Sequence, residues 1–152
     1  MYLEDLDKFK ATSINDTILK LEYKSLQVTI NAGKFDPKGK TIKYKKPQGE
    51  QQYVKSIDGK FPWGTDGNIP RNEYKFIQLK TGKKLITAKK AFYSNLFEPN
   101  PDMTTAYINN LTNTLFITAM NSDGAGGYVV MWKIENEQFI NIECSDRSEQ
   151  IA

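Results

Sequence analysis

Apolar residues recur at every second position in several short runs of this chain, and turn-forming residues separate the runs. In residues 19–23 and 26–30, leucine, isoleucine, valine and tyrosine alternate with polar side chains. A repeat of two residues places the apolar side chains on one face of a β-strand, whereas a helix needs a repeat of about 3.6. The apolar phase changes between Lys24 and Ser25, which indicates either a bulge or a tight turn. The pattern predicts a mainly β fold.

Further strands are expected in the rest of the chain. Residues 74–79 and 85–88, joined through Gly82, have the pattern of a β-hairpin with glycine at the turn. Alternating patterns also predict strands at 41–45, 106–108, 115–119, 128–134 and 139–144. The connections between the C-terminal strands are short, and short connections favour antiparallel neighbours. We therefore expect an antiparallel meander or sandwich.

Two short segments could be helical, which keeps an α+β fold possible. Residues 2–9 can place three apolar side chains on one helical face, and residues 91–97 are followed by two prolines, which end helices. A length of 152 residues suits a single domain covering residues 1–152. We expect the core on the alternating apolar positions Leu19, Leu21, Leu26, Val28, Ile30, Ile77, Leu79, Leu115, Ile117, Tyr128, Val130, Trp132, Ile140 and Ile142.

The composition argues against most enzymes. The chain has no histidine, so the usual general base and the usual metal ligand are missing. Its one cysteine, Cys144, can form neither an internal disulfide nor a thiolate zinc cluster. We therefore predict a protein without catalytic activity, bound metal or cofactor. No run approaches the roughly 20 apolar residues of a membrane helix, and the N-terminus is acidic, so we expect a cytoplasmic protein with no membrane partner.

The charge is distributed unevenly along the chain. Residues 34–90 carry 15 Lys and Arg against 5 Asp and Glu, whereas residues 91–152 carry 2 against 8. A basic surface could bind nucleic acid or an acidic protein, or its lysines could pair partly with the acidic C-terminal third. Only two of the 21 basic residues are arginine, the preferred side chain for reading bases, which argues against nucleic acid as the partner.

Three Asp-Gly pairs, at 58–59, 66–67 and 123–124, are typical of tight turns. The glycine-rich stretch 121–127 lacks the lysine and the helix of a phosphate-binding loop. Oxygen ligands from Asn121 and Asp123, with Asp66 from a second loop, would suit calcium, but only a fragment of an EF-hand pattern is present. The simpler interpretation is that these carboxylates accept hydrogen bonds from their own loops.

The two tryptophans have different surroundings in the sequence. Trp132 lies within a strand pattern, which predicts a core position. Trp63 lies in an irregular loop between Pro62 and Gly64, so it either is partly exposed or caps the core beneath that loop.

Three segments resemble those of a known group of proteins. They are residues 63–67 with Pro70, residues 96–100, and the stretch 121–128 followed by Trp132. They are similar to segments of small, largely uncharacterised bacterial proteins associated with immunity proteins of polymorphic or contact-dependent toxin systems. The resemblance covers about the C-terminal 90 residues. It implies that this protein neutralises a toxin as its binding partner, and it implies no catalytic activity. Residues 1–59 lie outside the resemblance and match no pattern that we can name.

We therefore predict an immunity-type binding protein that neutralises a cognate toxin domain by direct stoichiometric binding. A calcium-binding or nucleic-acid-binding β module is the alternative, followed by a hydrolase that uses the carboxylates of Asp66, Glu73, Glu98 and Asp123. Aromatic, charged and amide side chains in the loops and basic turns are the candidates for partner contacts. The predicted partner-binding residues are Trp63, Asp66, Lys83, Lys84, Lys89, Lys90, Asn121 and Asp123.

Overall fold

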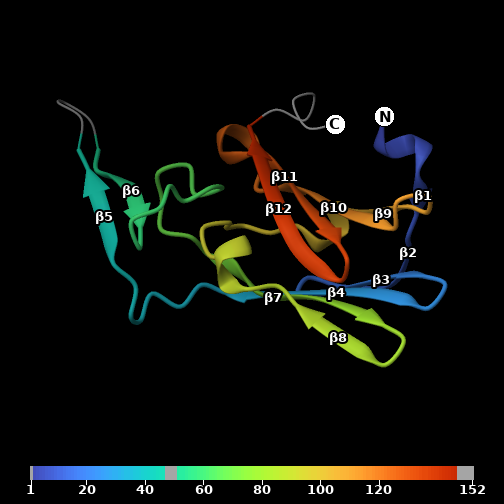
Figure 1. The fold of residues 1–152 in the computed structure, drawn as a ribbon. Coiled ribbons are helices and arrows are strands. Elements are labelled where there is room, and N and C mark those ends of the chain that lie inside the picture. The colour runs from blue at the N-terminus through green and yellow to red at the C-terminus, as the bar shows by residue number, and fades with distance from the viewer. Residues whose placement is uncertain (1, 47–50, 147–152) are drawn as a thin grey trace.

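The computed structural model describes residues 2–46 and 51–146, and it is mainly β, as predicted. Two five-stranded antiparallel sheets face each other and enclose a core to which both contribute (Figure 1). The helical content within the described residues consists of the 3₁₀ turns Leu3–Asp5, Lys90–Phe92, Pro101–Met103 and Gly124–Gly126. No helix among these residues has the length and apolar character needed to cross a membrane.

The first sheet has the strand order β1-β9-β10-β11-β12, and its last four strands form a meander of consecutive hairpins. These strands are β1 (Asp7–Lys8), β9 (Thr104–Asn109), β10 (Thr114–Asn121), β11 (Tyr128–Glu135) and β12 (Gln138–Ser145). The second sheet has the order β2-β3-β4-β7-β8. Its strands are β2 (Lys10–Ile14), β3 (Ile18–Tyr23), β4 (Leu26–Lys34), β7 (Asn72–Thr81) and β8 (Lys84–Thr87).

A long excursion interrupts the second sheet between two strands that are neighbours in space. β4 pairs directly with β7, although residues 35–71 separate them in the chain. The excursion contains a two-stranded ribbon of β5 (Ile42–Lys45) and β6 (Tyr53–Ile57), which lies beside the sandwich in Figure 1. The excursion then returns through residues 58–71 to the end of the sandwich at which β7 begins. This return path brings the loop around Trp63 to the other loops at that end.

The core confirms most of the predicted strand phases. Trp132 and Ile30 are fully buried, and all but three of the predicted core positions are buried with them. Leu26 and Ile142 are half-buried at the edge of the core. The prediction that Ile140 belongs to the core is wrong, because 44% of its surface is exposed.

A β-bulge explains the exposure of Ile140. Lys133 pairs with Asn141, whereas the next residue, Ile134, pairs with Phe139. Ile140 is the extra residue in β12, and an extra residue reverses the direction of the side chains that follow. Phe139 therefore packs against the core in place of Ile140.

The predicted turns and short helices have mixed outcomes. The change of phase after Tyr23 is a two-residue turn, in which Lys24 has a φ of 52° and Tyr23 pairs with Leu26. The predicted helix over residues 2–9 is wrong, because its second half forms β1 and pairs with β9. Eight residues make a marginal helix, so strand pairing decides the outcome. The predicted helical turns over residues 91–97 are reduced to the single 3₁₀ turn Lys90–Phe92.

Candidate binding site at the loop end of the sandwich

Three loops meet at one end of the sandwich, and we call this region the loop end. It consists of residues 61–71, 96–103 and 121–127. Trp63 and Phe97 connect the first two loops, since the Phe97 amide donates to the Trp63 carbonyl over 2.9 Å. Ser122 connects the third loop to both, because its amide donates to the Glu98 carbonyl and its hydroxyl donates to the Gly64 carbonyl. The loop end is therefore one hydrogen-bonded unit built from distant parts of the chain.

Asn121 is the buried centre of this unit. Its side chain is 2% exposed, and its amide nitrogen donates to the hydroxyls of Tyr74 over 2.7 Å and of Tyr128 over 3.2 Å. Its side-chain carbonyl oxygen accepts a hydrogen bond from the backbone amide of Asn100 over 2.9 Å. The Tyr128 hydroxyl in turn donates to the Phe97 carbonyl. A fully satisfied buried network of this kind rigidifies the groups that it joins.

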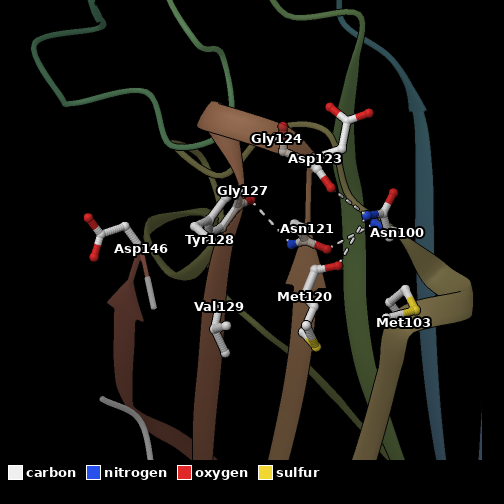
Figure 2. A pocket seen from close by; sticks show the side chains of 11 residues that line it. Asn100, Met103, Met120, Asn121, Asp123, Gly124, Gly127, Tyr128, Val129 and Asp146 are labelled. Atoms are coloured by element: carbon white, nitrogen blue, oxygen red, sulfur yellow. Dashed lines mark hydrogen bonds between the residues drawn. The ribbon is translucent and has the colours of Figure 1, made fainter. Parts of the chain in front are cut away.

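Asn100 extends the network to the end of β10. Its side-chain amide donates to the carbonyls of Met120 over 3.1 Å and of Ser122 over 3.0 Å (Figure 2). Its own carbonyl accepts a hydrogen bond from the Thr104 hydroxyl. The loop that contains Asn100 is thus attached to β10 through both backbone and side chain.

Glycines allow the loops to approach closely. Gly64 has a φ of 94°, and a Cβ atom added there would lie 2.5 Å from the Phe97 carbonyl oxygen. A Cβ atom on Gly126 would lie 3.1 Å from the Cβ atom of Asp66. Gly64 therefore has a structural role, because only a residue without a side chain permits this apposition, whereas a side chain at Gly126 would require its neighbours to shift.

The buried hydroxyl and thiol groups next to the loop end are protonated at neutral pH. Burial raises the pKa of the Tyr74 and Tyr128 hydroxyls, and the hydrogen bond from Asn121 offsets this only in part. Burial also raises the pKa of the Cys144 thiol to about 11, so at neutral pH it is a protonated thiol and a poor nucleophile. The two tyrosine hydroxyls therefore suit a structural network better than proton transfer at neutral pH.

Two of the four carboxylates considered for hydrolysis are engaged by backbone amides. Glu98 accepts hydrogen bonds from the amides of Arg71 and Asn72. Glu73 accepts one from the amide of Asp36 and pairs with Lys75 over 3.0 Å. These contacts assign both carboxylates a role in holding the loops.

An open groove of about 520 Å³ lies on the outer face of the first sheet next to the loop end. Figure 2 shows the side chains of Met103, Met120 and Val129 below, with Asp123 and Asp146 nearer the loops. The groove therefore combines apolar and acidic lining residues.

The structure brings four of the predicted partner-binding residues together. Trp63 is half-buried, with its ring centroid 5.6 Å from that of Tyr128. Asp66 is exposed beside the loop 121–127, and Asp123 is exposed at the groove. Asn121 is too deeply buried to contact a partner, so we correct its role to positioning the loops.

The four predicted lysines lie elsewhere. Lys83 is in the turn between β7 and β8, at the opposite end of β7 from the loop end. Lys84 pairs with Glu137 over 2.8 Å, as expected if the basic middle of the chain pairs partly with the acidic third. Lys89 and Lys90 are exposed at the start of a 3₁₀ turn. Lys83 and Lys84 therefore lie away from the loop end, and none of the four lysines lines the groove.

Sequence reasoning missed several residues of the groove. Met120 offered a signal, because it is an apolar residue at an outward position of a strand whose inward positions are Leu115, Ile117 and Ala119. Met103 and Asp146 offered none, since only the packed structure brings them to the groove.

The described part of the chain offers no cluster of acidic side chains in support of the calcium alternative. No group of three or more Asp, Glu, His or Cys side chains within residues 2–46 and 51–146 is placed to hold a metal ion. Comparison with known proteins returned no match to a family model, to a curated protein or to a solved structure.

Proposed function

We propose that this protein is an immunity-type binding protein that neutralises a cognate bacterial toxin domain by direct stoichiometric binding, without catalysis. The observation that carries the proposal is the loop end, where buried hydrogen bonds around Asn121 join three loops beside an open groove. A surface that is ordered before binding loses less conformational entropy when a partner arrives. The motif resemblance supports the same class of function, because the resembling segments form this end.

The residues exposed at the loop end also suit a protein partner. Phe61 is 64% exposed, and its ring stands edge-on to that of Trp63 with the centroids 5.2 Å apart. Exposed aromatic and methionine side chains bordered by charged groups are enriched in protein interfaces. We infer that the partner covers Phe61 and Trp63 together with the groove.

The test is binding to the toxin domain encoded beside this protein's gene. We expect a one-to-one complex by isothermal titration calorimetry and rescue of cells that express the toxin. The double variant Lys83→Glu with Lys84→Glu is the control, because these residues lie at the far end of β7. Absence of a heat of binding at micromolar concentrations, when both proteins are folded, would contradict the proposal.

Replacing Asn121 by leucine should lower the free energy of unfolding by about 2–3 kcal/mol, because it leaves buried partners without a hydrogen bond. The same variant should weaken toxin binding, since the loops lose their common attachment. Urea unfolding followed by fluorescence measures the first effect. Asn141→Leu, on the exposed face of β12, is the control and should change stability by less than about 0.5 kcal/mol. Equal unfolding midpoints for the two variants would show that the network is not stabilising.

A further inference from the structure

We propose that the groove at the loop end binds a basic segment of the protein partner, in which lysine or arginine side chains lie next to an apolar side chain. This inference rests on the proposed function and specifies the chemistry of the partner. It follows from three properties of the surface, which are its unpaired carboxylates, its apolar groove and the spacing of its charges.

Carboxylates gather around the groove from four separate parts of the chain. Asp123 and Asp146 line the groove itself, Asp102 lines an adjoining hollow of about 290 Å³, and Asp66 lines another of about 380 Å³. All four side chains are exposed. Within the described residues, none of these carboxylates forms a hydrogen bond or an ion pair.

Positive charge is scarce in the same place. Arg71 is the one basic residue among the described residues that line the three hollows. Its Nε atom lies 3.4 Å from a carboxylate oxygen of Glu98, which offsets its charge locally. The surface is therefore net negative, and a net negative surface attracts a cationic partner and repels phosphates.

Two exposed methionines form the apolar part of the groove. Met103 is 47% exposed and Met120 is 49% exposed, and both line the groove with Val129. Met120 extends outward from β10, on the side of the sheet that faces away from the core. Methionine side chains adapt their shape to a partner, so this floor suits an inserted aliphatic or aromatic side chain.

The spacing of the carboxylates favours a segment over a single ion. No three acidic side chains in the described part of the chain come close enough together to share one metal ion. Carboxylates that are spread around a groove can instead each face a different cation along an extended segment. A strand or loop with several basic side chains and one apolar side chain therefore fits both the charges and the floor.

The direct test titrates the ¹⁵N-labelled protein with synthetic peptides of equal length in place of the partner. The peptides alternate lysine with leucine, lysine with serine, glutamate with leucine, or serine with leucine. We expect the lysine-leucine peptide to shift the amide signals of Met103, Met120 and Val129 and to bind about tenfold more tightly than the others. Raising NaCl from about 50 to about 200 mM should weaken this binding, because the carboxylates are exposed.

Matched variants assign the effect to the groove. Asp123→Asn with Asp146→Asn should weaken the lysine-leucine peptide about tenfold, whereas Glu4→Gln with Asp5→Asn removes the same charge elsewhere and should change little. Met120→Thr should weaken binding about fivefold while leaving the fold intact, because this side chain is exposed on a strand.

Three results of the peptide titration would overturn the inference. They are equally tight binding of the glutamate-leucine peptide, shifts confined to another surface, and no shift at millimolar peptide. Equally tight binding of the toxin domain to the Asp123→Asn, Asp146→Asn variant and to the parent would also contradict a role for the groove. It would leave the proposed function intact. Binding of the peptide without binding of the toxin domain would support the groove inference and contradict the proposed function.

Discussion

Replacing Trp132 by alanine should lower the free energy of unfolding by about 3–5 kcal/mol, against a total of roughly 5–15 kcal/mol for a domain of this size. Trp132 is fully buried between the two sheets. Its indole nitrogen donates to the Phe92 carbonyl over 2.8 Å, and its ring stands edge-on to Tyr74 with the centroids 5.6 Å apart. The variant therefore loses a large apolar side chain and leaves a buried carbonyl without its partner.

Chemical unfolding of the parent and the variant measures this loss, and poor solubility of the variant is expected. Leu111→Ala is the control, since Leu111 is 93% exposed in the turn between β9 and β10. Its effect should stay within about 0.5 kcal/mol. Trp132→Phe keeps an aromatic ring but removes the indole donor, so it should have an intermediate effect. A Trp132→Ala variant that unfolds like the parent would place Trp132 outside the core.

Replacing Gly64 by alanine should be of comparable severity, with a loss of about 3–5 kcal/mol from backbone strain and steric overlap. The new Cβ atom would lie 2.5 Å from the Phe97 carbonyl oxygen and 2.9 Å from a ring carbon of Tyr128. Relief of this overlap requires the loop around Trp63 to move away from its neighbours. We therefore expect the variant to lose partner binding as well as stability.

Gly59→Ala is the matched control for this variant. Gly59 has a φ of 78°, but no atom lies within 4 Å of an added Cβ. It should cost only about 1–2 kcal/mol, which is the strain of an L-residue in a left-handed conformation. Thermal unfolding and binding calorimetry of both variants separate the two contributions. Equal losses of stability in the two variants would mean that steric overlap between the loops contributes nothing to the effect of Gly64→Ala.

The distribution of charge along the sequence does not predict where the charged surfaces of the folded protein lie. The sequence predicts a basic middle and an acidic C-terminal third. In the structure, Asp66 comes from the basic middle and joins Asp102, Asp123 and Asp146 at the loop end. Glu137, which belongs to the same acidic third, lies in the turn between β11 and β12 and pairs with Lys84. The acidic surface is therefore a product of packing.

For most of the hairpins, the sequence by itself determines where the strands lie and, apart from the bulge at Ile140, which side of each strand faces the core. It gave no signal for β2 and β6. Strand position and the side that faces the core both follow from local causes, because turn residues such as Gly82 act over a few positions and alternation assigns each side chain to a face. The meander from β9 to β12 was predicted correctly for this reason.

Only the tertiary structure decides which distant strands pair and which polar residues become buried. Asp7 pairs with Ile108, and β4 pairs with β7 across an excursion of many residues, so neither pairing has a local signal. Asn121 has the polar character of a turn residue, yet it is 2% exposed, because Tyr74 and Asn100 supply its hydrogen bonds. Burial of an amide is favourable only when such partners are in place, and the fold alone brings them there.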